Sequence, residues 1–182
     1  NPVDILLLIN PDNPSGNYIP VKDVFRLADW CSARGIRLIV DESFVDFSSD
    51  FPGNSLLDNS ILERYPGLTV VKSISKSFGV PGLRLGVLAS SDPDVVASVR
   101  KDVSIWNINS FATVASVMFE DDHYINLTKS LILTERNLIF SALSSRKSIK
   151  VFQPSANFVL IKLLKEGQTA SEVFEYCLLN RD

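Results

Sequence analysis

Lys76 is the residue of this sequence whose type and setting best suit covalent chemistry. It lies in the serine-rich turn Ser73–Ser77, between an apolar stretch and a glycine-containing loop. A lysine amine that is partly desolvated in such a turn can act as a nucleophile. A loop lysine is more commonly a solvated surface charge, because lysines are mostly exposed. Position alone therefore leaves both interpretations open.

Hydroxyl and guanidinium groups close to Lys76 in the sequence could bind a phosphate. Ser73 and Ser75 precede it, and Arg84 follows eight residues later. Arginine offers a rigid fork of donors to a phosphate, and serine adds neutral ones. The serine hydroxyls could instead satisfy backbone groups of the turn.

Two further polar residues follow apolar runs. Asp41 comes directly after the run 36–40, and Asn13 lies in the turn-forming cluster 10–16 after the run 5–9. A carboxylate at a strand end must be paired or hydrogen-bonded if it is buried, and a protonated ring nitrogen would serve. The ordinary alternatives are a helix cap or solvated loop for Asp41 and a turn residue for Asn13.

The elements that must position these residues alternate along the chain. Apolar runs predict strands, and apolar residues at helical spacing predict helices. The predicted strands cover 5–9, 36–40, 68–71, 85–89, 149–152 and 157–163, and the predicted helical segments cover 20–34, 92–103, 109–144 and 169–179. This pattern indicates an α/β fold, with three α/β/α layers around a mostly parallel sheet of buried strands. The carboxyl ends of such strands form the usual ligand crevice, so Asn13, Asp41 and Lys76 should converge there.

Composition limits the classes of partner. The chain has 182 residues, 46% of them hydrophobic, and a net charge of −3. It offers no basic field for nucleic acid or an anionic membrane, so neither is an expected partner. Cys31 and Cys177 lack disulfide-framework or zinc-ligand spacing, which favours a reducing cytoplasm. The acidic run beside His123 is expected to be solvated, so no metal is assigned, and Trp30 and Trp106 are expected to be packing residues and not stacking platforms.

Three motifs together are far more specific than any single residue. In order they are Asn10–Gly16, Asp41–Phe44 and Ser73–Gly86, the last with the lysine and an arginine eight positions on. They resemble the class I and II aminotransferase family, most closely histidinol-phosphate aminotransferases and threonine-phosphate decarboxylases. The resemblance implies that residues 1–145 are part of the cofactor-binding large domain and that 146–182 begin a small C-terminal α+β domain. Because the chain starts at Asn1 and its only methionine is Met118, we expect a fragment of a longer enzyme.

The resemblance implies a cofactor, pyridoxal 5'-phosphate, and assigns catalytic roles. Lys76 would hold the cofactor as a Schiff base and later move the α proton of the substrate. Asp41 would keep the pyridinium nitrogen protonated, which preserves the ring as an electron sink. Asn13 would donate a hydrogen bond to the phenolic oxygen of the ring.

The remaining assignments concern the phosphate and the substrate. By the resemblance, Ser73, Ser75 and Arg84 would anchor the phosphate, although Ser75 could instead orient the lysine. Asn157, and after it Asn109, would contact the substrate, a small amino acid or keto acid. Enzymes of this type are usually homodimers, so self-association is expected.

Phe44 departs from the family pattern, because most members have a tyrosine there whose hydroxyl contacts the phenolic oxygen. The segments that precede and follow the matched region in the family, including the arginine that binds the substrate carboxylate, lie outside this sequence. The expected activity is amino-group transfer. The alternatives are decarboxylation of a phosphorylated amino acid, which the Phe44 departure favours, and a catalytically reduced domain of a fusion protein.

Overall fold

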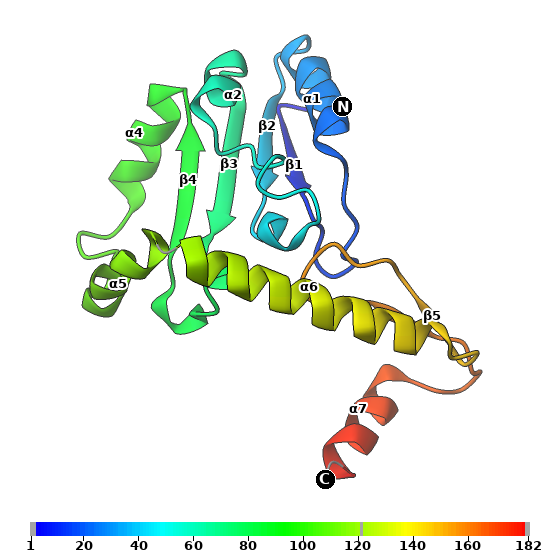
Figure 1. The fold of residues 1–182 in the computed structure, drawn as a ribbon. Helices are drawn as coiled ribbons and strands as arrows, with labels where there is room; N and C mark the ends of the chain where they lie inside the picture. Colours follow the sequence, from blue (N-terminus) through cyan, green and yellow to red (C-terminus); the bar gives the residue numbers. More distant parts are fainter. Residues whose placement is uncertain (1–2, 121, 181–182) are drawn as a thin grey trace.

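A four-stranded sheet forms the centre of the molecule (Figure 1). The computed structural model describes residues 3–120 and 122–180. The strands lie in the order β1-β2-β3-β4, and the first three are parallel. Their bounds are β1 Ile5–Ile9, β2 Arg37–Asp41, β3 Leu68–Ser73 and β4 Gly86–Ser90. The strand order brings the ends of β2 and β3 side by side, as the sequence predicted.

The helices α1 (Val21–Ser32) and α2 (Asn59–Arg64) pack on one face of this sheet. In α1, Val24, Ala28 and Cys31 are buried, and their spacing of four and three residues forms one helical stripe. Asp58 caps α2 by accepting the N–H groups of its first turn, which explains a short helix that the sequence pattern did not predict.

The opposite face of β1 is exposed, so the prediction of a fully buried first strand is wrong. Leu6 and Leu8 pack against the core, whereas Ile5, Leu7 and Ile9 are 56%, 61% and 37% exposed. Side chains alternate across a strand, so a continuous apolar run buries only the side that another element covers. Within the described residues, only the core side of this edge strand is covered.

The fourth strand runs antiparallel to β3, which the sequence pattern did not show. The connection from β3 contains only the short helices α3 (Ile74–Ser77) and η2 (Pro81–Leu83), and not the longer helix that usually connects parallel strands. Gly86 pairs with Ser73, and a Cβ on Gly86 would lie 3.1 Å from the carbonyl oxygen of Lys72. Glycine thus allows β4 to pass close to the segment that carries the lysine.

The helical region predicted over 109–144 is divided into three elements. They are α5 (Ser110–Ala115), η3 (Ser116–Glu120) and α6 (Asp122–Ser144), and they follow α4 (Pro93–Asp102). The long helix α6 passes below the end of the sheet at which β2 and β3 finish (Figure 1). Trp106, in the connection between α4 and α5, is 90% exposed, and Trp30 is 46% exposed with the Arg34 guanidinium over its ring. Neither tryptophan is buried, so the expectation that both are packing residues is wrong for the described part of the chain.

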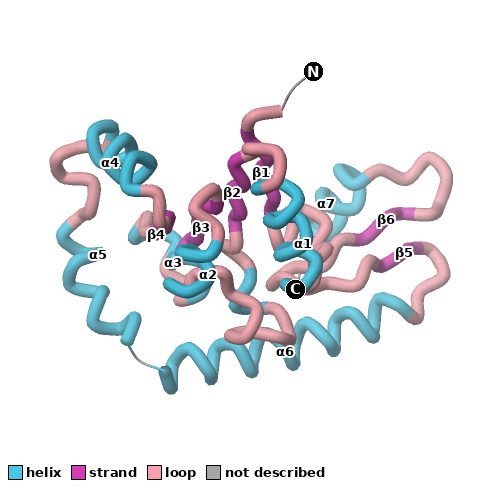
Figure 2. Tube along the Cα trace, turned by 90° about the horizontal axis from the view of Figure 1, so that it is seen from above, coloured by secondary structure: helices cyan, strands magenta, loops and turns pink. Residues whose placement is uncertain are grey.

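A separate two-stranded sheet lies beside the C-terminal half of α6, at the far end from α4 (Figure 2). It contains β5 (Ile149–Val151) and β6 (Ile161–Leu163), which are antiparallel, and α7 (Ala170–Leu179) follows. The strand predicted from residue 157 begins only at Ile161. The described part of the chain contains no helix long and apolar enough to cross a membrane.

Candidate active site

The carboxyl ends of β2 and β3 place Asp41 and Lys76 at the same edge of the sheet. Asp41 is the last residue of β2 and lies opposite Val71 of β3. β3 ends at Ser73, whose N–H donates to the Ser43 hydroxyl over 3.0 Å. Lys76 follows within α3. The two segments that carry the acidic and the basic residue are therefore bonded directly to each other.

The Lys76 side chain is exposed, and its Nζ lies 5.2 Å from the centroid of the Phe44 ring. Phe44 is 7% exposed, and it forms a T-shaped pair with the Phe158 ring at a centroid distance of 5.3 Å. A phenyl ring in this position holds an ammonium against its face but offers no hydroxyl. The departure noted in the sequence thus lies directly beside the Lys76 amine.

The Asp41 carboxylate is half-buried, and its Oδ1 accepts the Ser43 N–H over 2.9 Å. Among the ion pairs that the described residues form, neither Asp41 nor Lys76 takes part. One carboxylate and one ammonium at the same edge thus remain available to a ligand. This donor set fits a pyridoxal phosphate, which needs an amine for its aldehyde and an anion for its protonated ring nitrogen.

Ser75 is occupied by backbone contacts instead of facing a ligand. It is 2% exposed, its hydroxyl donates to the Leu85 carbonyl over 3.3 Å, and it accepts the Leu85 N–H over 3.1 Å. These contacts fix α3 to the start of β4. The geometry supports the alternative role that the sequence left open, in which Ser75 orients the lysine turn.

Arg84 is exposed and has the left-handed backbone angles φ 54° and ψ 47°. Its Nη1 donates to the Pro81 carbonyl over 3.2 Å. A residue with a side chain rarely adopts this backbone region, and such residues cluster at ligand sites. The conformation is consistent with an Arg84 guanidinium that is placed near Lys76 to bind a phosphate.

Asn13 is exposed in the loop after β1, and Ser73 is half-buried at the end of β3. The same loop contains Gly16, whose carbonyl accepts the Ser155 N–H over 2.9 Å. Gly16 has φ +70°, and a Cβ there would meet the Pro154 backbone at 3.4 Å. The loop after β1 is therefore attached to the segment that carries Phe158.

The two asparagines predicted to contact substrate occupy different surroundings. Asn109 caps α5 by accepting the Ala112 N–H over 2.9 Å, and its amide donates to the Leu83 carbonyl over 2.9 Å. Asn157 is exposed and borders a groove of about 400 Å³ beside Phe158 and α6. Asn109 thus joins α5 to the connection between β3 and β4 that contains Lys76. Asn157 instead directly precedes Phe158, whose ring packs against Phe44.

Sequence reasoning missed two buried acids in the loop after β2, Glu42 and Asp46. Glu42 is 1% exposed and accepts the Ser55 hydroxyl over 2.7 Å and the Leu56 N–H over 2.8 Å. Burial raises the pKa of the Glu42 carboxyl, although these bonds act in the opposite direction. The available signal was the presence of three acids, Asp41, Glu42 and Asp46, within six consecutive residues.

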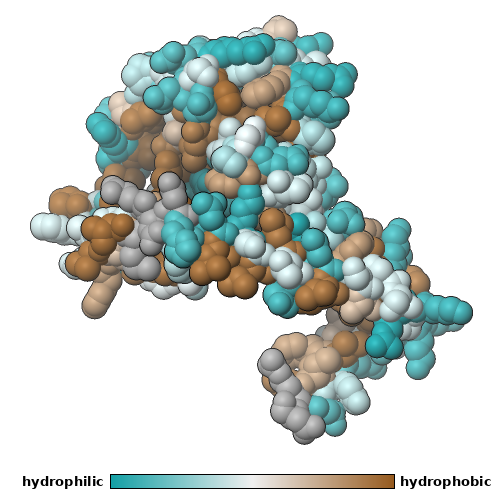
Figure 3. Space-filling view, in the orientation of Figure 1, coloured by the Kyte–Doolittle hydropathy of each residue, from teal (hydrophilic) through white to brown (hydrophobic). Residues whose placement is uncertain are grey.

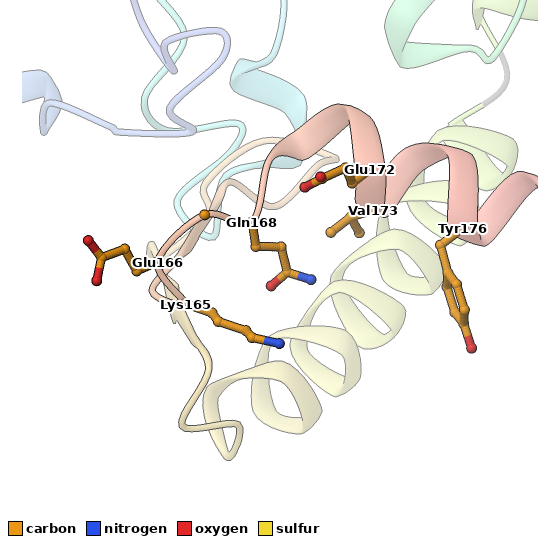
Figure 4. A pocket seen from close by; sticks show the side chains of 7 residues that line it. Lys165, Glu166, Gln168, Glu172, Val173 and Tyr176 are labelled. Atoms are coloured by element: carbon orange, nitrogen blue, oxygen red, sulfur yellow. The ribbon is translucent and has the colours of Figure 1, made fainter.

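A cavity of about 590 Å³ lies elsewhere, between the turn at residues 165–168 and α7 (Figure 4). Every residue that lines it is surface-accessible, and none belongs to the three sequence motifs: Lys165, Glu166, Gly167, Gln168, Glu172, Val173 and Tyr176. Within the described part of the chain, no cluster of side chains could hold a metal ion. We therefore place the candidate site at Lys76 and Asp41, and not at this cavity.

The fold and this lysine–carboxylate edge are consistent with a pyridoxal-phosphate type of site, and comparison with known proteins identifies the family. The family model for aminotransferase class I and II matches residues 1–182, so the chain belongs to this family. The solved structure of histidinol-phosphate aminotransferase from Clostridium acetobutylicum superimposes with a TM-score of 0.86 at 28% identity, covering 97% of this chain and 52% of that chain. The predicted family and fold are confirmed.

Two curated relatives show the range of activities around this sequence. The chain is 32% identical to threonine-phosphate decarboxylase of Salmonella typhimurium, over 90% of this chain and 44% of that protein. It is 33% identical to CMP-5'-(3-aminopropyl)phosphonate synthase of Streptomyces rubellomurinus, over 94% of this chain and 27% of that protein. The chain thus spans less than half the length of each of these relatives.

Proposed function

We propose that the protein containing this chain is a pyridoxal-phosphate-dependent aminotransferase that moves an amino group between an amino acid and a keto acid. The observation that carries the proposal is the presence of Lys76 and Asp41 at the ends of adjacent parallel strands, both outside the ion pairs of the described residues. Family membership supports the same cofactor. Pyridoxal phosphate, when bound, supplies an electron sink for a carbanion at the substrate α-carbon.

The residues of this chain would divide the work at that cofactor. Lys76 would hold the cofactor through Nζ, and its free amine can move a proton at the substrate α-carbon. Asp41 would pair with the ring nitrogen, and Asn13 would donate to the phenolic oxygen. The Phe44 ring excludes water from one side of Nζ.

The phosphate and substrate would be bound by neighbouring side chains. Arg84 and Ser73 would donate to the phosphate, and Ser75 would keep the turn in place through Leu85. Asn157 remains our first candidate for a substrate contact, with Asn109 second. A division into residues 1–145 and 146–182 is supported by the separate β5–β6 sheet.

A lyase activity is the second candidate, because Phe44 replaces the tyrosine usual in aminotransferases of the family. The similarity to a threonine-phosphate decarboxylase supports it. A decarboxylase would release carbon dioxide from a phosphorylated amino acid, whereas an aminotransferase would produce a keto acid. Measuring both products from one amino-acid panel separates the two activities.

The decisive test of cofactor attachment is borohydride reduction of the full-length protein with pyridoxal phosphate, followed by peptide mapping. We expect the reduced adduct on Lys76 and its loss in Lys76→Arg. Lys22→Arg changes another exposed lysine and should leave the adduct in place. An adduct on a different lysine of the wild type would overturn the assignment.

Self-association as a homodimer in the cytoplasm completes the proposal. The connection between α4 and α5 and the adjoining helix expose large apolar side chains, among them Ile105, Trp106 and Phe111 at 92%, 90% and 80% exposure. Figure 3 shows hydrophobic side chains gathered at this side of the molecule and along α6. Patches of this kind are typical of protein interfaces. Sedimentation of the full-length protein, with Trp106→Ser as the variant, tests this interface.

A further inference from the structure

Asp46 forms hydrogen bonds to residues on both sides of Lys76 in the sequence. It lies in the 3-10 helix η1 (Val45–Phe47) and is 6% exposed. Its Oδ1 accepts the Lys72 ammonium over 2.7 Å, and its Oδ2 accepts the Ser77 hydroxyl. Lys72 precedes Lys76 by four residues, and Ser77 follows it directly. A single carboxylate from the loop after β2 thus contacts the chain both before and after Lys76.

The same short helix places the ring against which the amine lies. Phe44 precedes η1 directly and lies 5.2 Å from Lys76 Nζ, measured to the ring centroid. Phe158 and Phe47 pack against that ring at centroid distances of 5.3 and 6.4 Å. Because η1 connects Phe44 to Asp46, a change in the carboxylate contacts would move the amine relative to the ring.

Lys76 itself contributes no ion pair that would fix its position within the described residues. Its side chain is exposed, so its direction depends on the backbone of α3. That backbone is held by the Ser75–Leu85 contacts on one side and by Asp46 on the other. Charge-assisted hydrogen bonds to a buried carboxylate are the stronger of these two restraints.

We propose that Asp46 is a positioning residue for Lys76, acting through Lys72 and Ser77. It would touch neither the substrate nor the cofactor. The proposal rests on the proposed function for the role of Lys76, and it adds a residue that determines where the Lys76 amine is presented. Lys72 and Ser77 are the two side chains through which it acts.

The test uses the full-length protein and the variants Asp46→Ala and Asp46→Glu. We expect Asp46→Ala to lower kcat by about tenfold or more, the effect of losing a charge-assisted hydrogen bond, with KM unchanged. Asp46→Glu retains the carboxylate and should recover most of kcat. The surface variant Asp23→Ala, which loses only an exposed contact to Arg26, should match the wild type.

Hydrogen exchange of the cofactor-free protein gives a readout that does not depend on catalysis. In Asp46→Ala, amides of residues 74–80 should exchange about tenfold faster or more, while amides of α1 remain unchanged. If Asp46→Ala does not fold, Ser77→Ala removes one of the two contacts and should show the same changes at smaller size. A folded variant with normal kcat and normal exchange at 74–80 would overturn the proposal. Absence of a Lys76 adduct in the wild type would instead contradict the proposed function.

Discussion

The loop after β2 and the helix α7 are two short segments that are stabilised in different ways. All residues from Glu42 to Ser48 are buried, and their side chains contact β3, α3 and the loop at residues 54–56. No residue of α7 is buried, and Phe174 and Tyr176 are 66% and 68% exposed. The loop after β2 is therefore fixed by contacts with distant parts of this chain, whereas α7 depends on hydrogen bonds within and next to the helix.

Phe47→Ala should have the largest effect, because it truncates the most buried large side chain of the loop. Phe47 is 2% exposed and packs in a cluster with Phe44 and Ala156. We expect a loss of about 3–5 kcal/mol in unfolding free energy, measured by urea denaturation of the full-length protein. Phe174→Ala on α7 is the matched control and should change it by less than about 0.5 kcal/mol. Equal losses for both variants would contradict the comparison.

Lys72→Met should be next, because it leaves the Asp46 carboxylate buried without its cation. The side chains of this pair are only 13% and 8% exposed. Removing one partner of a buried pair costs about 3 kcal/mol or more. Arg26→Met breaks the exposed pair with Asp23 and should cost at most about 0.5 kcal/mol. Similar denaturation midpoints for the two variants would show that burial of the pair is unimportant.

Glu42 should give the loop its own dependence on pH. Because the pKa of Glu42 is raised in the folded state, the folded protein binds more protons than the unfolded chain between the ordinary and the raised pKa. Its contribution to the unfolding free energy is then fully present below the ordinary pKa and falls as pH rises through the raised one. We therefore expect the wild type to become less stable as pH increases across that range.

Glu42→Gln should remove that slope while retaining partners for Ser55 and Leu56. The measurement is the urea midpoint of wild type and variant across mildly acidic to neutral pH. A matched Glu135→Gln variant, on the exposed side of α6, should keep the wild-type slope. Parallel curves for wild type and Glu42→Gln would mean that the pKa of Glu42 is the same in the folded and unfolded protein.

The comparison also explains what the sequence could predict. Apolar runs located β1 to β5 to within one or two residues, because core residues such as Leu38 and Val70 repeat at strand period, whereas β6 begins four residues later than predicted. The direction of β4 was not predictable from its residues, since it depends on how short the preceding connection is. Likewise, the apolar composition around Trp106 did not reveal that the described structure leaves it uncovered.

Within the candidate site, the sequence identified the motif residues but not the residues that hold them in place. Lys76 and Asp41 were found because they belong to motifs with a fixed order. Asp46 contacts Lys72 and Ser77 across 26 and 31 residues of sequence, so no local spacing indicates these pairs. Ser75 shows the same limit, because its partner Leu85 lies ten residues away, at the other end of the connection between β3 and β4. Long-range hydrogen bonds therefore account for most of what was missed.

Thr169→Ala should have the smallest effect, and it tests whether α7 depends on its cap. The Thr169 hydroxyl accepts the Glu172 N–H, and the Glu172 carboxylate accepts the Thr169 N–H over 2.7 Å, which forms a capping box. These bonds hold the pKa of Glu172 below its usual range. We expect about fivefold faster amide exchange in α7, the equivalent of the roughly 1 kcal/mol that an N-cap threonine contributes.

The matched variant is Asp58→Ala, which removes the cap of α2. In α2, Leu62 is 8% exposed and packs in the core, so tertiary contacts oppose fraying after the cap is lost. Exchange in α2 should therefore rise less than in α7, although both helices lose a side-chain cap. If α2 loses more protection than α7, local bonds would govern both helices and burial would not distinguish the two regions.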